Sequence, residues 1–267
     1  SLILGIFLLY LKKTRSATYS LIAAVLFSIQ FLGYFFELDP KIIEFEIHQP
    51  KLKIAQFNVL NSNNSKALTI KGIIASNADV VSIQETDKAW TDELKKSLKS
   101  NYPFTVYFPS EQCCFGISMI SKQPLLNADV TFHGGVPNIE ADLFFDGQLT
   151  HVISSHTSSP ISRRNLKARN QHLSALKNHV AKLDSPTIVI GDFNTVPWDE
   201  NMITLKEDAH LIDSRKSYTS TFPSYLGYAG IPIDYILHTE EITCTKFNSI
   251  PIEGSDHMGI IGEYVIN

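Results

Sequence analysis

The sequence predicts a layered α/β (α+β) domain that begins near residue 51 and follows a hydrophobic N-terminal segment. Three observations predict this fold class. Short apolar runs alternate with longer stretches of helical spacing, one pair of runs reads as a hairpin, and 44% of the residues are hydrophobic. Mixed strand order of this kind argues against a doubly wound fold. The sequence contains no G-x-G-x-x-G or P-loop motif, so we expect no nucleotide cofactor.

The first 36 residues are expected to anchor the chain in a membrane. From Ser16 to Phe36 there is no charged side chain, and about 20 apolar residues suffice for a helix to cross a bilayer. We therefore predict a transmembrane segment over 17–36. The apolar stretch 1–11 is expected to be a truncated first span, because the chain begins without Met. A signal peptide and a buried soluble helix are the alternatives.

Charges on either side of this segment predict its orientation. Lys12, Lys13 and Arg15 precede it, and the linker 37–50 begins with acidic residues. Because basic residues stay on the cytoplasmic side of a membrane, we expect the domain 51–267 to lie outside the cytoplasm.

Overall charge and cysteine content restrict the function only weakly. The net charge is −4, and residues 1–50 hold equal numbers of acidic and basic side chains. Domains that bind long nucleic acids mainly through phosphates are usually basic, although a metal ion can neutralise a substrate locally. Cys113 and Cys114 are adjacent, so we do not expect them to bridge each other. Either of them is able to pair with Cys244 in an oxidising compartment.

Hydrophobic periodicity predicts the elements of the domain in chain order. Apolar runs predict strands, and apolar residues at three-and-four spacing predict helices. The predicted strands are 52–60, 79–85, 116–122, a hairpin over 141–156 with its turn at Asp146-Gly147, 187–194, 231–238 and 257–266; the predicted helices are 66–76, 87–100 and 163–183. The aromatic stretch from Tyr102 to Phe115 fits a substrate-facing loop and core packing equally well.

Polar side chains that are able to take part in catalysis or metal binding lie at the ends of these apolar strands. They are Asn58, Glu85, His156, Asp192 and Asn194 at or after strand ends, Asp234 within a strand, and Asp256 and His257 before one. Strand ends cluster at one rim of a sheet, where sites tend to form. An Asp inside an apolar strand is costly unless it is paired, and His257 is the expected partner of Asp234.

This set of side chains predicts a metal site for phosphoester chemistry. Taken alone, Glu85 fits a helix cap, and Asp192 and Asn194 fit an Asx turn. Together the carboxylates and amides offer hard oxygen ligands, which suit Mg²⁺ or Mn²⁺ and do not suit Zn²⁺. A Mg²⁺ ion held by one or two carboxylates and the substrate phosphate is the arrangement used in metal-assisted phosphoester hydrolysis.

Several motifs together resemble one superfamily. They are KIAQFNVL, VVSIQET, GISMISKQPL, HVISSHTSSP, IVIGDFNTVPW, PIDYIL and GSDHMG, and they span nearly all of residues 51–267. In this order they resemble the endonuclease/exonuclease/phosphatase (DNase I-like) superfamily and, with the N-terminal segment, a membrane-anchored bacterial branch of it. The resemblance implies a four-layer α/β/β/α sandwich of two mixed β-sheets at a bacterial inner or plasma membrane. Thr157 directly follows His156, at a position where the family often has Leu.

The resemblance also implies the metal ligands. Glu85 corresponds to the main ligand of Mg²⁺ or Mn²⁺. Asn58 and Asp256 correspond to residues close to the metal ion or its waters.

The remaining matched positions imply catalytic roles. Asp192 corresponds to the group that activates the attacking water, and Asn194 to a hydrogen-bond partner of the nucleophile or a phosphoryl oxygen. His257 corresponds to a phosphate contact oriented by Asp234. His156 corresponds to an acid or a second phosphate contact. His151, His172 and His179 are assigned no role, as packed or solvent-facing residues.

We therefore expect a Mg²⁺-dependent hydrolase that cleaves phosphodiester or phosphomonoester bonds by in-line attack of water, with nuclease activity as one form. The alternative is a sphingomyelinase-like or lipid-phosphate phosphodiesterase at the membrane surface, and a non-catalytic scaffold is the third reading. The expected partners are a phosphoester substrate, either nucleic acid or phospholipid, and the membrane.

Overall fold

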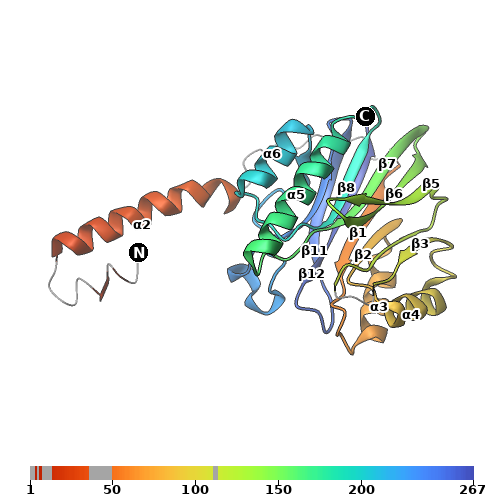
Figure 1. Cartoon of the computed structure of the whole chain (residues 1–267), viewed down its shortest axis with the longest axis horizontal. Helices are drawn as coiled ribbons and strands as arrows, with labels where there is room; N and C mark the ends of the chain where they lie inside the picture. Colours follow the sequence, from red (N-terminus) through yellow and green to blue (C-terminus); the bar gives the residue numbers. More distant parts are fainter. Residues whose placement is uncertain (1–3, 5, 8–13, 36–49, 111–113) are drawn as a thin grey trace. The chain divides into compact units, whose positions relative to one another are not determined.

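The computed structural model describes residues 4, 6–7, 14–35, 50–110 and 114–267 (Figure 1). The chain divides into two compact units, residues 1–43 with 216–218 and residues 44–215 with 219–267. Helix α2 (Thr14–Phe35) belongs to the first unit.

The expected transmembrane segment over 17–36 is not supported. Within the described part of the chain, no helix combines the length and the apolar character that a bilayer crossing requires. Most of the stretch 1–11 and nearly all of the linker 37–50 lie outside the described residues. The location outside the cytoplasm stays a prediction.

Two six-stranded mixed sheets form the second unit (Figure 1). Sheet A has the order β11 (Ile242–Pro251), β12 (Met258–Ile266), β1 (Leu52–Asn58), β2 (Val80–Gln84), β4 (Ile117–Ser121) and β3 (Phe104–Phe108). Sheet B has the order β5 (Leu126–His133), β6 (Val136–Phe145), β7 (Gln148–His156), β8 (Thr187–Asp192), β10 (Asp234–His238) and β9 (Ile212–Asp213).

Helices cover the outer faces of both sheets, as Figure 1 shows. Helices α3 (Lys66–Ser76) and α4 (Lys88–Leu98) pack on sheet A, and α5 (Arg163–Val180) and α6 (Glu200–Asp208) pack on sheet B. A third apolar cluster, which includes Ile54 and Ile190, lies between the sheets. The central strands are thus buried on both faces, which explains the near-continuous apolar runs in the sequence.

The elements predicted from hydrophobic periodicity are confirmed, and several others were missed. Helix α3 has the predicted bounds and ends at Asn77, which has left-handed backbone angles and closes the last turn. The missed elements are β3, β5, β9, β11, α6 and the 3₁₀ helix η1 (Ser224–Ala229). Strands β5 and β11 lie at sheet edges with mostly exposed or half-buried residues, so their sequences lack the apolar run of a central strand.

Strand direction brings the polar strand ends of each sheet to one place. The parallel pair β1/β2 aligns Asn58 with Gln84, and the parallel pair β7/β8 aligns His156 with Asp192. Strand β10 runs antiparallel to β8, so its first residue, Asp234, also pairs with Asp192. Strand β12 likewise starts beside the end of β1, directly after His257.

Gly191 allows β7 and β8 to approach closely. Its φ is +151°, and a Cβ there would lie 1.7 Å from the carbonyl oxygen of Ser155. We expect Gly191→Ala to lower the free energy of unfolding by about 3 kcal/mol, because two paired backbones cannot move apart locally without strain. Urea unfolding measures this change.

Gly72→Ala is the matched control. A Cβ at Gly72 meets no atom within 4 Å, and alanine in a helix interior is expected to add up to about 1 kcal/mol. Equal stabilities of the two variants would contradict the close-approach explanation.

Candidate active site at the ends of both sheets

Asn58 links the carboxylates of the two sheets. Its Nδ2 donates to Oε1 of Glu85 at 3.1 Å and to Oδ2 of Asp192 at 3.0 Å. Its Oδ1 accepts from the backbone N–H of Leu60 at 3.2 Å, which fixes the orientation of the amide. Asn58 is therefore a donor to both acidic groups, and its own oxygen is engaged by the following turn.

Glu85 follows β2 in a strained backbone conformation. Its φ is +63°, in the left-handed region that a residue with a long side chain seldom occupies. Such strain costs roughly 1–3 kcal/mol and persists where function requires it. The conformation brings the side chain toward β1, where Oε2 also accepts from the backbone N–H of Asn61 at 3.1 Å. The strain favours a functional role for Glu85 over a capping role.

Asp192 is the buried centre of the site. Its Oδ2 lies 3.6 Å from Nε2 of His156 and 3.7 Å from Nε2 of His257. Its Oδ1 accepts from the backbone N–H of Asn194 at 2.9 Å. Burial alone would raise the pKa of Asp192, but the nearby imidazoles of His257 and His156 outweigh it and lower the pKa below its usual value. Asp192 is therefore ionised at neutral pH.

Asp234 has the histidine partner that the sequence led us to expect. Its Oδ2 accepts from Nδ1 of His257 at 2.9 Å, and its Oδ1 accepts from Nε2 of Gln56 at 2.7 Å. Burial lowers the pKa of His257, but the charges of Asp234 and Asp192 outweigh burial and raise that pKa to about 10. His257 is thus an imidazolium whose Nε2 faces Asp192, and the ring of Phe222 packs beside it with centroids 4.8 Å apart.

The three remaining predicted residues differ in how they are placed. His156 is buried, and although burial lowers its pKa, Asp192 outweighs this effect and raises it. The Nδ2 of Asn194 donates to the backbone oxygen of Thr157 at 3.0 Å, so this amide anchors the loop after β7. Asp256 has a buried Oδ1 without a hydrogen-bond partner.

Two residues that support the site were not predicted. Gln56 joins Gln84 of β2 to Asp234 of β10. Ser255 donates from Oγ to the backbone oxygen of Asn58 at 2.7 Å and accepts from the N–H of His257 at 3.1 Å. A signal existed for Gln56, because it lies two residues before Asn58 and strand alternation places both on one face.

The oxygen donors of the site fit a divalent cation. Each oxygen of Glu85 accepts one hydrogen bond and retains a lone pair, and Oδ1 of Asp256 is a buried acceptor with no partner. Side-chain atoms of Asp192, Asp234 and His257 also lie within 4.8 Å of one another. Asp234 and His257 in this group already form a hydrogen-bonded pair.

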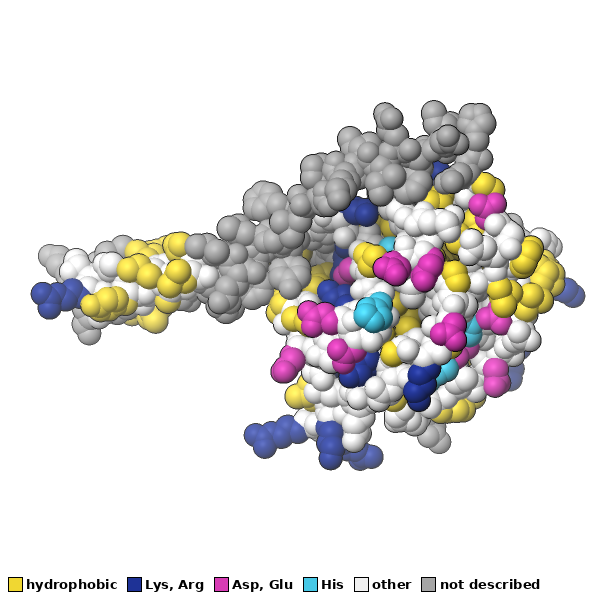
Figure 2. All heavy atoms as spheres, turned by 90° about the horizontal axis from the view of Figure 1, so that it is seen from above, with side chains coloured by type: hydrophobic (Ala, Val, Ile, Leu, Met, Phe, Trp, Pro, Cys, Tyr) yellow, Lys and Arg dark blue, Asp and Glu magenta, His cyan; other side chains and the backbone are white. Residues whose placement is uncertain are grey.

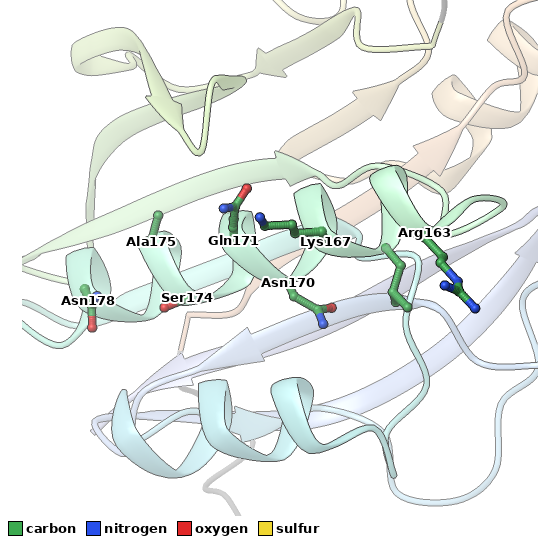
Figure 3. Close-up of a pocket in the computed structure, with 8 residues that line it drawn as sticks. Arg163, Lys167, Asn170, Gln171, Ser174, Ala175 and Asn178 are labelled. Carbon is green, nitrogen blue, oxygen red and sulfur yellow. The ribbon is translucent and has the colours of Figure 1, made fainter.

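A pocket elsewhere on the surface is separate from this site. It lies on the outer face of α5 and is lined by polar side chains including Arg163, Lys167 and Asn170 (Figure 3). None of the predicted site residues lines it, so we assign it no part in the chemistry.

Solved structures share this fold. The endonuclease/exonuclease/phosphatase from Beutenbergia cavernae matches at a TM-score of 0.66 with 18% identity, over 81% of this chain and 72% of that chain. D. rerio TDP2 complexed with single strand DNA product matches at 0.66 with 20% identity, over 80% and 99%. Sphingomyelinase C from Streptomyces griseocarneus matches at 0.56 with 17% identity, over 80% and 99%. A comparison with curated proteins finds no match.

The sequence profile of one family covers the whole site. The Endonuclease/Exonuclease/phosphatase family profile matches residues 55–257. This range includes all eight predicted site residues, from Asn58 to His257. The two mixed sheets with helices on their outer faces agree with that assignment. The chain belongs to the endonuclease/exonuclease/phosphatase family.

Proposed function

We propose that this chain is a Mg²⁺-dependent phosphodiesterase that hydrolyses its substrate by in-line attack of water. Endonucleases, exonucleases and phosphatases all hydrolyse phosphoester bonds, so the family supports the reaction class. The observation that carries the proposal is the convergence of Glu85, Asp192 and the Asp234–His257 pair where the ends of both sheets meet.

Glu85 and Asp256 would hold the metal ion, with Asn58 close to the ion or to water bound to it. A bound Mg²⁺ stabilises the negative charge that develops on phosphoryl and leaving-group oxygens. Mn²⁺ has the same ligand preference and is expected to replace it. The half-buried position of Glu85 and its fixed backbone present its carboxylate to this end of the sheets without further rearrangement.

Asp192 and the two histidines supply the acid–base chemistry. Ionised Asp192 accepts a hydrogen bond from the attacking water and aligns it with the phosphorus atom. His257 stays protonated, so its Nε2–H donates to a phosphoryl oxygen while Asp234 holds the ring through Nδ1. The Nε2 of His156 lies 3.6 Å from Oδ2 of Asp192, and we expect it to donate to a second phosphoryl oxygen.

Two substrate classes fit this reaction. Nucleic acid is the first. On the face that Figure 2 shows, the basic side chains are interspersed with acidic ones. Phospholipid is the second, and η1 favours it. Tyr225 and Tyr228 are 80% and 91% exposed, and the N–H of Ser224 at the start of η1 donates to the backbone oxygen of Asp256 at 2.7 Å. Exposed aromatic rings beside a site suit a lipid interface.

One assay separates the two substrate classes. The full chain in mild detergent is incubated with Mg²⁺ and either plasmid DNA or vesicles of phosphatidylcholine and sphingomyelin. Nicked DNA would identify a nuclease, and phosphocholine released from vesicles would identify a lipid phosphodiesterase. We expect EDTA to abolish product and added Mg²⁺ to restore it. Product that persists in EDTA would overturn the metal-dependent reaction, and no product from either substrate would favour a non-catalytic scaffold.

Isosteric variants test the two carboxylates. Asp192→Asn and Glu85→Gln keep the shape of the side chains and remove their charge, so we expect each to lower kcat by roughly three orders of magnitude. Circular dichroism should show an unchanged fold. Asp129→Asn, at an exposed position on edge strand β5, is the matched control and should retain full activity. Near-wild-type turnover in either site variant would contradict the role proposed for that carboxylate.

The pH profile tests the Asp234–His257 pair. A required imidazolium loses its proton as pH rises, so activity should fall as pH passes through about 10, the raised pKa of His257. Asp234→Asn removes the charge that raises this pKa. We expect the alkaline decline to move to lower pH and kcat to drop by roughly 10²-fold. If Asp234 were merely structural, the variant would lose stability but keep the alkaline limb of wild type.

A further inference from the structure

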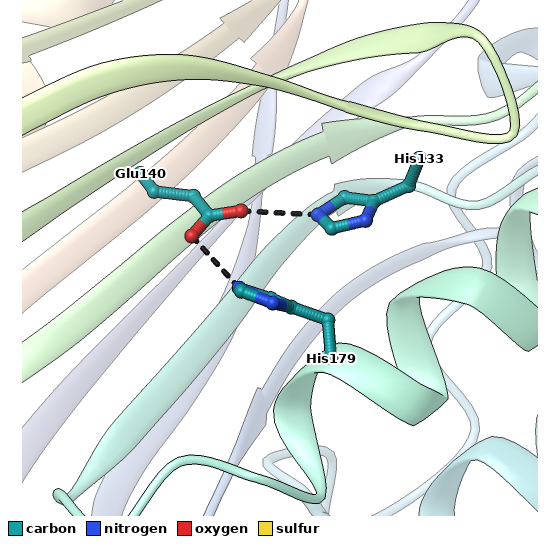
Figure 4. A group of neighbouring side chains, drawn as sticks. All are labelled: His133, Glu140 and His179. Carbon is teal, nitrogen blue, oxygen red and sulfur yellow. Dashed lines mark hydrogen bonds and ion pairs between the residues drawn. The ribbon is translucent and has the colours of Figure 1, made fainter.

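Three histidines converge on one buried carboxylate on the outer face of sheet B. Nε2 of His133 lies 3.0 Å from Oε1 of Glu140, and Nε2 of His179 lies 2.9 Å from its Oε2 (Figure 4). Nε2 of His151 lies 3.3 Å from the same Oε2. We call these four residues the histidine cluster. Neither the family chemistry nor the proposed mechanism uses any of them.

The fold brings the cluster together from four separate elements. His133 ends β5, Glu140 lies in β6, His151 lies near the start of β7, and His179 occupies the last turn of α5. Adjacent strands β5, β6 and β7 direct these side chains to the face that α5 covers. His151 lies five residues before His156 and on the opposite face of β7, so the cluster is roughly 16 Å along the strand from the catalytic end.

Glu140 is the negatively charged centre of the cluster. Burial raises the pKa of Glu140, but hydrogen bonds from His133 and His151 outweigh it and hold that pKa well below its usual range. Glu140 and Asp142 together balance at most two imidazolium charges. The rings of His133 and His179 are only 4.8 Å apart, where two positive charges would repel each other. A metal ion that binds here would replace the ring protons that face Glu140.

Hydrogen bonds with neighbouring groups fix the orientation of the cluster's side chains, as they do around metal ligands. Nδ1 of His151 lies 2.6 Å from Oδ1 of Asp142, the carboxylate–histidine contact that orients a ring and raises its basicity. Thr131 donates from Oγ1 to Oε1 of Glu140 at 2.6 Å. Glu140 is 7% exposed, whereas the side chain of His179 is 33% exposed, so an ion has a route of entry from the side of α5.

We propose that His133, Glu140 and His179, with His151 as the fourth ligand, bind a Zn²⁺ ion that fastens the C-terminal end of α5 to sheet B. Zn²⁺ favours four nitrogen and oxygen ligands in a tetrahedral arrangement. Ligand atoms of His133, Glu140 and His179 all lie within 4.8 Å of one another. Around one Zn²⁺ such atoms lie about 3.3 Å apart, so side-chain movements of about 1 Å bring these three together. Three imidazoles distinguish this site from the oxygen-rich catalytic site.

Cobalt substitution tests the site directly. The full chain is stripped of metal with a chelator and titrated with Co²⁺, whose tetrahedral complexes absorb visible light far more strongly than octahedral ones. We expect one equivalent of strongly absorbing Co²⁺ that Zn²⁺ displaces and excess Mg²⁺ does not. Zn²⁺ should also raise the Tm of the stripped protein. Glu85→Gln, which alters the catalytic metal site, should leave both signals unchanged, so this result is independent of the phosphodiesterase proposal.

Variants of the cluster decide the outcome. His133→Gln and His179→Gln should each weaken Zn²⁺ binding at least about tenfold and remove the strong absorption. His179 is partly exposed, so His179→Gln is the variant expected to fold normally, and its thermal unfolding without metal checks this. His210→Asn, at an exposed position outside the cluster, is the matched control. Weak, octahedral-type Co²⁺ spectra, or equal Zn²⁺ affinity in wild type and His179→Gln, would reduce the cluster to an ion-pair network and overturn the proposal.

Discussion

Hydrogen bonds between the two sheets position the catalytic end of the molecule. Gln56 of sheet A donates to Asp234 of sheet B at 2.7 Å, at the level where the apolar filling between the sheets gives way to polar side chains. Buried polar groups are costly when unpaired, so this contact accepts only one relative position of the two sheets. Asp234 in turn holds His257, and His257 faces Asp192. The geometry of the site therefore depends on how the strands of the two sheets pack against each other.

The charges at this end depend on one another. His257 lies between two carboxylates, and its positive charge is what lets Asp234 and Asp192 remain buried. Asn58 adds a neutral donor shared by Glu85 and Asp192. A substrate phosphate would bring further negative charge to this place, and the imidazolium of His257 would partly offset it. Strain at Glu85 is tolerated because the surrounding strands fix its backbone.

Much of this arrangement could be predicted from the sequence because central strands carry a strong local signal. Apolar runs ending in Asn58, Glu85 or Asp192 indicated both the strands and the rim where they meet. Edge strands β5 and β11 lack such runs and were missed. The histidine cluster was also missed, since His133, Glu140 and His179 come from separate elements and only tertiary packing joins them. The apolar stretch 17–36 had the composition of a membrane span, yet composition alone did not establish one.

The division of the site between two sheets makes it sensitive to distant packing. Asn58 belongs to sheet A and Asp192 to sheet B, and their side chains meet at 3.0 Å across the interface. Any slide of one sheet over the other therefore changes the spacing of the reactive groups directly. A residue of the core between the sheets, such as Ile54 or Ile190, sets that spacing by its volume. Substitutions that change how this interior is filled are therefore expected to shift the reactive groups before the fold itself is lost.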